Sequence, residues 1–143
     1  GPEEFDAARL RAKGCRDTLA NAGLPPPLVL HGQWSEVWGR EAMAQLLAGP
    51  RPDAVFCGND QIARGCADAL REAGLSCPDD VALVGFDNWN VMAEAARPPL
   101  TSVDMNLVQL GAEAGRQMIE MINGVRVIGT RRLPCTLVVR QSS

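Results

Sequence analysis

Short apolar runs alternate with helix-patterned stretches along the chain, and this alternation constrains the fold more than any other feature. Three apolar runs have the length and flanking turn residues of buried strands: residues 28–30, 54–57 and 81–86. Apolar residues recur at helical spacing between them, over 35–47 and 60–73. Strands that alternate with helices through short turns form βαβ units. The sequence therefore predicts an α/β fold with a parallel sheet flanked by helices on both faces.

The remaining segments fit the same plan. A helix over 6–22 ends before Gly23, a common residue at helix C-termini. A long amphipathic helix over 104–123 ends at Gly124. Shorter segments complete the prediction: residues 87–96 irregular or briefly helical, 101–103 extended after two prolines, and 137–139 a last strand.

Length and charge exclude several classes of protein. The 143 residues suffice for one domain with a real core, but not for a large multidomain enzyme. The net charge is −3 and no run of Lys or Arg occurs, which argues against nucleic-acid binding by this segment itself. No apolar stretch approaches the roughly 20 residues that span a bilayer. We therefore expect no membrane partner.

The cysteine pattern argues against a metal or redox site. The five cysteines are odd in number and widely spaced, without a CxxC pair, and the single histidine has no cysteine nearby in sequence. We expect no bound metal, a reducing compartment, and cysteines that act as small buried hydrophobes. They are Cys15, Cys57, Cys66, Cys77 and Cys135.

A polar loop follows each of the three predicted strands, at residues 31–34, 58–61 and 87–90. In an open parallel sheet these loops emerge at one edge, beside the N-termini of the following helices, and ligands bind there. The three loops would bring Trp34, an indole, together with polar side chains. The sequence thus predicts one binding site at the carboxyl edge of the sheet.

The residues of these loops suit a neutral, polyhydroxylated ligand. The Asp87 carboxylate accepts hydrogen bonds from hydroxyl groups, Asn59 both donates and accepts, and Trp34 offers a flat apolar face to a sugar ring. There is no phosphate-binding glycine motif and no GxSxG elbow, so nucleotide-dependent and serine-hydrolase chemistry are disfavoured. Asp60 and Asp87 form a conceivable glycosidase pair, although nothing in the sequence sets their separation.

Each of these side chains also has a structural interpretation. Asn59 or Asp60 can cap the following helix, and Asp87 has the same ambiguity. Trp34 can cover the core beside Trp38, and His31 can be a satisfied loop residue. Three polar loops at one edge favour binding more than any single loop does.

Three longer motifs resemble the effector-binding domain of LacI/GalR-type bacterial transcriptional regulators. They are VFCGNDQIARG at 55–65, PDDVALVGFDN at 78–88 and PPLTSV at 98–103, and both ends of the chain are also typical of that family. The resemblance implies the C-terminal lobe of a periplasmic-binding-protein-like type I fold. Residues 1–103 and 131–143 would form this lobe, and 104–130 would be a crossover helix and connection packed with an absent N-terminal lobe.

The resemblance also implies a function and its residues. Arg11, Trp34, Asn59 and Asp87 would bind a small effector, most naturally a carbohydrate; Arg11 is supported by the resemblance alone. The lobe would form a homodimer in which helix 60–73 and residues 89–101 contribute, unless their apolar residues are core. Operator DNA would be bound only through a missing helix-turn-helix headpiece.

We therefore expect a cytoplasmic effector sensor without catalytic activity or cofactor, whose ligand binding is coupled to DNA binding. The alternative is a periplasmic sugar-binding receptor of a transport system, which shares the fold. The unpaired cysteines argue against that alternative, because the periplasm favours disulfides.

Overall fold

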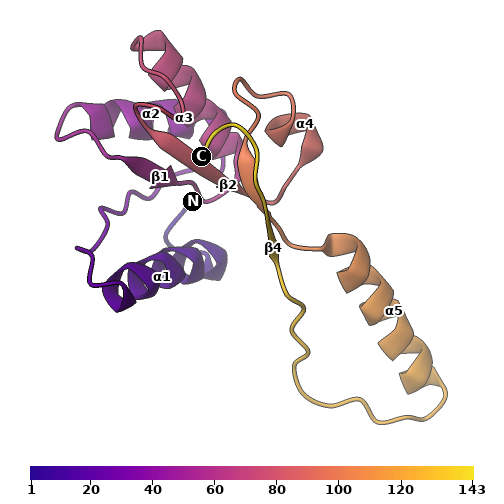
Figure 1. Ribbon diagram of the computed structural model, residues 1–143. Coiled ribbons are helices and arrows are strands. Elements are labelled where there is room, and N and C mark those ends of the chain that lie inside the picture. Colours follow the sequence, from indigo (N-terminus) through magenta and orange to yellow (C-terminus); the bar gives the residue numbers. More distant parts are fainter.

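Four short strands form one sheet in the structure, a computed structural model that describes residues 1–143 (Figure 1). In sequence order the elements are α1 (Asp6–Asn21), α2 (Glu36–Leu47), β1 (Ala54–Phe56), α3 (Asp60–Glu72), β2 (Ala82–Phe86), α4 (Asn90–Ala93), β3 (Thr101–Asp104), α5 (Leu107–Ile122) and β4 (Thr136–Val138). The strands lie in the order β1-β2-β3-β4, and the first three are parallel. The predicted α/β class and parallel sheet are confirmed. β4 differs by running antiparallel to β3.

Helices lie on both sides of the sheet, as predicted. α2 and α3 pack together on one face, where Val55 of β1 contacts the core (Figure 1). α1 lies on the other face, where its Arg11 stacks on the ring of Phe86 at the end of β2. Side chains two residues apart on a strand share a face, so β2 also presents Val84 toward α1.

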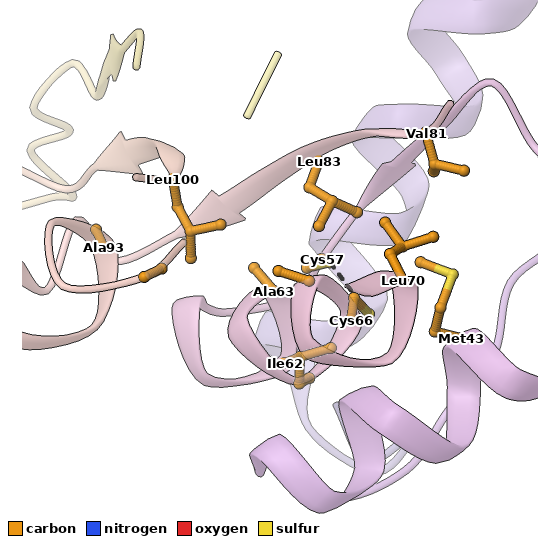
Figure 2. Packing of buried hydrophobic residues seen from close by; sticks show 12 residues of the cluster. Met43, Cys57, Ile62, Ala63, Cys66, Leu70, Val81, Leu83, Ala93 and Leu100 are labelled. Atoms are coloured by element: carbon orange, nitrogen blue, oxygen red, sulfur yellow. Dashed lines mark hydrogen bonds between the residues drawn. The ribbon is translucent and has the colours of Figure 1, made fainter. Parts of the chain in front are cut away.

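The core lies between α2, α3 and the sheet. Met43, Leu70 and Leu83 are completely buried there, and Figure 2 shows them packed around α3. α2 and α3 approach closely at two glycines: a Cβ on Gly39 would lie 2.3 Å from the carbonyl oxygen of Ile62, and a Cβ on Gly65 is equally excluded. The apolar face of α3 is therefore core, which is the alternative that the sequence left open for helix 60–73.

Local sequence signals account for the helix boundaries. The Ser35 hydroxyl accepts a hydrogen bond from the Trp38 amide at 3.1 Å, the N-cap contact predicted for this residue. Gly23 and Gly74 follow the C-termini of α1 and α3 with φ of +70° and +72°, a conformation in which side chains are strained.

The strand predicted at residues 28–30 does not form, which corrects the sequence prediction. Residues 24–33 have no regular secondary structure and no partner strand, and Leu28 is exposed. A cavity that 28–30 and β1 both line separates this segment from the free edge of β1. The three prolines that precede Leu28 also lack amide donors. An apolar run becomes a strand only where a neighbouring backbone can pair with it.

α5 extends away from the rest of the molecule (Figure 1). It has no buried residue, and apolar side chains along it, including Leu110, Met118 and Met121, are exposed. The chain then returns through residues 123–135 to β4. None of the helices has both the length and the apolar character that a membrane span requires.

All five cysteines are free thiols. Cys57 and Cys66 are buried, and their sulfur atoms lie 3.9 Å apart, a contact drawn in Figure 2. The hydrogen bond to Cys66 and burial both raise the pKa of Cys57. These two fit the expectation of small buried hydrophobes, but Cys135 is exposed and does not.

Candidate ligand-binding site

The carboxyl ends of β1 and β2 lie side by side, because Phe56 pairs with Val84 in a parallel register. The loops that begin at Cys57 and Asp87 therefore leave the sheet at the same edge, as the sequence predicted. The side chain of Arg11, which belongs to α1 on one face of the sheet, also reaches this edge. Its contacts show which loops meet there.

Arg11 connects all three predicted loops. One guanidinium nitrogen donates to the carbonyl oxygen of Gly58 at 2.6 Å, and another lies 3.7 Å from a carboxylate oxygen of Asp87. The guanidinium carbon also lies 5.6 Å from the ring centre of Trp34 and 3.7 Å from that of Phe86. A planar, delocalised cation can stack and donate at the same time, which an ammonium group cannot do.

The Arg11 and Asp87 side chains are partly withdrawn from water, with exposed fractions of 18% and 34%. Burial lowers the pKa of Arg11 and raises that of Asp87, in each case against the attraction of the other group. At 3.7 Å the two groups form an ion pair but no hydrogen bond. The Asp87 carboxylate thus combines partial desolvation with unused acceptor capacity.

The backbone at Asp87 is held in an uncommon conformation. Its φ is +103° and that of Asn88 is +49°, both in the region that favours glycine. Two hydrogen bonds from β3 fix the turn: the Asp87 amide donates to the Val103 carbonyl at 3.0 Å, and the Asn88 amide donates to the Ser102 hydroxyl at 3.0 Å. Strain that surrounding contacts maintain is typical of functional sites.

Asp60 supports the same turn from α3. One of its carboxylate oxygens accepts from the Ser102 hydroxyl at 2.5 Å, and the other accepts from the Trp89 amide at 2.7 Å. The side chain is buried against Gly85, where a Cβ would lie 2.2 Å from the carboxylate. Burial raises the pKa of Asp60 despite these hydrogen bonds. Both oxygens of Asp60 are thus committed to the fold and not free to pair with Asp87 in catalysis.

Asn88 links this turn to the C-terminal segment. Its side-chain amide donates to Asp104 at 3.2 Å, and its carbonyl oxygen accepts from Arg140 at 2.8 Å. The loop after β2 is therefore anchored to α3, β3 and the C-terminal segment at once, which keeps Asp87 at the edge of the sheet.

Asn59 caps α3, the structural role that the sequence left open. Its side-chain oxygen accepts from the Ile62 amide at 2.8 Å, and the residue is 7% exposed. The side-chain amino group lies 3.5 Å from the Gln61 side-chain oxygen, at the limit of a hydrogen bond. Asn59 has its acceptor engaged and can offer a ligand one donor.

Trp34 packs over two glycines at the edge. A Cβ on Gly1 would lie 2.2 Å from its ring, and a Cβ on Gly58 would lie 2.9 Å from it. His31 is a satisfied loop residue, with Nδ1 3.2 Å from the Gly1 carbonyl oxygen. The glycines bring the indole down onto the backbone beside Arg11, and only glycine allows that approach.

The structure brings Arg11, Trp34 and Asp87 together and places Asn59 beside them, next to Gly58. Two further groups at this edge were not predicted: Phe86, which supports the guanidinium, and the Gly58 carbonyl, which orients it. Phe86 is the last residue of β2 and precedes Asp87 directly, so its position in the sequence could have indicated it. Together the groups offer an acceptor, a cation and an aromatic surface, the combination that binds a molecule with hydroxyl groups and an apolar ring face.

This fold, with polar groups gathered at the carboxyl edge of a parallel sheet, is typical of small-molecule-binding lobes. The model of the periplasmic binding protein-like domain matches residues 1–143, and the chain belongs to that family. The resemblance to LacI/GalR-type regulators is confirmed by the relatives described next.

The curated relatives are bacterial transcriptional regulators. The HTH-type transcriptional repressor CytR of Escherichia coli (strain K12) is 33% identical over 147 residues, which cover 100% of this chain and 43% of CytR. The HTH-type transcriptional regulator CelR of Thermobifida fusca is 36% identical over 146 residues, 99% of this chain and 43% of CelR. The chain thus spans less than half the length of these relatives.

Solved structures show the same similarity. A complex of the transcriptional regulator CelR with cellobiose superposes with a TM-score of 0.88 at 35% identity, covering 100% of this chain and 45% of that one. The lac repressor dimer bound to operator and the anti-inducer ONPF gives 0.91 at 30% identity, covering 100% and 50%.

Proposed function

We propose that this chain is the effector-sensing lobe of a cytoplasmic LacI-type transcriptional regulator. The effector is a small polyhydroxylated molecule, most naturally a carbohydrate, and it binds at the carboxyl edge of the sheet. Arg11 and Asp87 bind its hydroxyl groups, Trp34 covers its ring, and Asn59 adds one donor. Operator DNA is bound by a helix-turn-helix headpiece outside this chain.

One observation supports this proposal most strongly: Arg11 contacts all three loops while Asp87 lacks a hydrogen-bond donor. A partly exposed ion pair without a direct hydrogen bond adds little to folding, so its position at the edge of the sheet is better explained by ligand binding. A ligand hydroxyl group can donate a hydrogen bond to the Asp87 carboxylate. Its oxygen can in turn accept from Arg11.

The relatives support the class of effector and the coupling to DNA. CelR has a structure with cellobiose, the lac repressor has one with operator and ONPF, and the ribose operon repressor of Escherichia coli is 39% identical over 125 residues. Coupling requires that the effector bind the DNA-competent and DNA-incompetent forms with different affinity. A coupling of roughly 1–3 kcal/mol gives an effect of about 5–150-fold, and operator DNA must change effector affinity by the same factor.

The domain assignment is part of this proposal. Residues 1–103 and 131–143 form the effector-binding lobe, and 104–130 pack with a second lobe that completes the cleft. The absence of buried residues on α5 supports this division, because an amphipathic helix buries its apolar face against something. The homodimer contact then involves residues 89–101, where Trp89 and Val91 are exposed, rather than the apolar face of α3.

A periplasmic transport receptor of the same fold is the alternative function. Five free thiols and the regulator relatives both favour the transcriptional regulator. The two functions share the binding chemistry, so the difference between them concerns DNA coupling and compartment.

Calorimetric titration of the full-length protein with mono- and disaccharides, cellobiose included, tests the proposal. At least one sugar is expected to bind. Arg11→Lys keeps the charge but loses the planar fork, and Asp87→Ala loses the acceptor; each should weaken binding roughly 10–100-fold, equivalent to about 1.4–2.8 kcal/mol. Asp79→Ala, at an exposed carboxylate of the same lobe, is the matched control. Unchanged affinity in both site variants contradicts the assignment.

A further inference from the structure

The turn that presents Asp87 depends on restraints from the rest of the molecule. Asp87 and Asn88 both have positive φ although neither is a glycine, and such a conformation persists only where surrounding contacts impose it. β3 and Asp60 hold three successive backbone amides of the turn, those of residues 87–89. The Asn88 side chain adds a separate restraint, which involves two charged groups.

The Asn88 side chain lies between an anion and a cation. Its amino group donates to a carboxylate oxygen of Asp104 at 3.2 Å, and its carbonyl oxygen accepts from Arg140 at 2.8 Å. An amide in this position has its positive end toward the carboxylate and its negative end toward the guanidinium, so the two hydrogen bonds strengthen each other. Each bond also has a charged partner, which makes it stronger than a bond between neutral groups. The orientation of Asn88 is therefore fixed by charge as well as by shape.

Both charged partners of Asn88 are themselves held in place. The second carboxylate oxygen of Asp104 accepts from the Asn106 amide at 2.7 Å, just before α5 begins. The Arg140 side chain is 15% exposed and donates to the Leu100 carbonyl at 2.8 Å. Neither side chain can rotate away from Asn88 without breaking a second hydrogen bond. The series Asp104–Asn88–Arg140 is thus anchored at both ends.

The segment that contains Asp104 also contacts the other member of the ion pair. Met105 follows Asp104, and its sulfur lies 3.9 Å from a guanidinium nitrogen of Arg11. Asp104 thus bonds to the turn that presents Asp87, while its neighbour in sequence contacts Arg11. The residues between β3 and α5 therefore reach both charged groups of the candidate site.

We propose that Asp104 and Asn88 are positioning residues of the effector site, with Arg140 as the fixed anchor of Asn88. Their hydrogen bond holds the Asp87 carboxylate where it and Arg11 can bind the same ligand hydroxyl. Neither residue contacts the ligand, because both polar ends of the Asn88 side chain and both oxygens of Asp104 are occupied by protein groups. This role rests on the proposed function, since it concerns affinity for the effector.

An exchange of the two side chains tests the pair. In Asn88→Asp alone, two carboxylates face each other; in Asp104→Asn alone, one acceptor oxygen remains for the donors of Asn88 and Asn106. Each single variant should weaken sugar binding by the full-length protein roughly tenfold in calorimetry.

The double variant should restore the site. The carboxylate at position 88 can accept from Arg140 and from the new amide at position 104, whose oxygen can still accept from the Asn106 amide. All three hydrogen bonds and the net charge are kept, so the sugar affinity should return to within about threefold of the native value. Asp79→Asn, at an exposed carboxylate, is the matched control and should leave it unchanged.

Amide hydrogen exchange of the 143-residue chain, measured without sugar, reports on the turn itself. The Asp87 amide bonds to the Val103 carbonyl, and the Cys57 amide, which bonds to Val84, serves as the internal reference. Relative to that reference, the Asp87 amide should exchange at least about fivefold faster in each single variant and at the native rate in the double variant.

Three results would overturn the proposal: native sugar affinity in the single variants, unchanged exchange of the Asp87 amide in them, or a double variant that binds sugar as weakly as the single ones. A native protein that binds no sugar contradicts the proposed function instead. The exchange rates of the Asp87 amide then decide on their own whether the pair holds the turn.

Discussion

Replacement of Asp87 by glycine is expected to stabilise the folded chain while it removes the ligand site. Asp87 has a φ of +103°, which glycine adopts without strain. Its carboxylate is partly buried without a hydrogen-bond donor, and burial raises its pKa. Both features oppose folding, so their presence is explained by function rather than by stability.

The expected change in the free energy of unfolding follows from the backbone conformation and the contacts of Asp87. Relief of the backbone strain favours the variant by about 1–3 kcal/mol. Loss of the ion pair with Arg11 costs about 0–1 kcal/mol, and the greater freedom of glycine in the unfolded chain costs roughly 0.4–1 kcal/mol. We expect Asp87→Gly to be more stable by about 1 kcal/mol, which raises the melting temperature by roughly 4 °C.

The stability that Asp87→Gly gains over the native chain should depend on pH. Because the pKa of Asp87 is raised in the folded state, the folded chain holds this proton more tightly than the unfolded chain. Ionisation therefore lowers the stability of the native chain as pH rises from the unfolded value of 3.8 through the raised folded pKa. The advantage of Asp87→Gly should thus be larger at pH 7 than at pH 3.

Urea unfolding followed by circular dichroism measures these differences. Asp79→Gly, at an exposed position with ordinary φ, is the matched control and should lose roughly 0.4–1 kcal/mol. Strain and burial at Asp87 do not oppose folding if Asp87→Gly is destabilised as much as Asp79→Gly, or if its stability advantage does not increase between pH 3 and pH 7.

Three further variants test other parts of the structure. Asp60→Asn replaces one of the two acceptor oxygens with an amino group, which then faces the donor from Ser102 or Trp89, and it should lower the free energy of unfolding by about 1–3 kcal/mol. Phe86→Leu removes the ring beneath Arg11 and should weaken sugar binding by the full-length protein roughly tenfold in calorimetry, while the fold is retained. The exposed apolar face of α5 should make the 143-residue chain associate, which light scattering detects; Met118→Glu should reduce the association.

Each of these has a clear contrary result. Asp53→Asn, at an exposed residue, should be neutral, and an Asp60→Asn variant that matches it would show that the buried hydrogen bonds contribute little. Full sugar affinity in Phe86→Leu would mean that Arg11 needs no aromatic support. A strictly monomeric mass at high protein concentration would show that α5 requires no partner surface.

Periodicity alone predicted most of the elements. β1, β2, α2 and α3 form where the apolar spacing indicated, because each packs against a neighbour present in this chain. Residues 28–30 have equally good strand composition and remain unpaired. Strand formation depends on a partner backbone as well as on composition, and that dependence cannot be read from three residues.

The edge of the candidate site was predictable, but its internal arrangement was not. The carboxyl ends of parallel strands meet by geometry, which placed Asp87 beside the loop after β1. Trp34 also lies at this edge, although the strand predicted before it does not form. Arg11 lies on a helix with no preceding strand in this chain, so only the resemblance indicated it. The Asn59 cap is a local contact that the sequence allowed as one of two roles. The stacking of Arg11 on Phe86 and the positive φ of Asp87 depend instead on tertiary contacts, which join α1 to β2 and the Asp87 turn to β3.

An effector is expected to bind where Arg11, Trp34 and Asp87 meet. A two-dimensional NMR titration of the 143-residue chain, with a sugar that binds the full-length protein, locates the contact residue by residue. Half a cleft should bind weakly, and saturation should shift the Trp34 indole and the Asp87 amide while the Trp38 indole stays in place. Shifts confined to other faces of the lobe, with Trp34 and Asp87 unmoved, would contradict it.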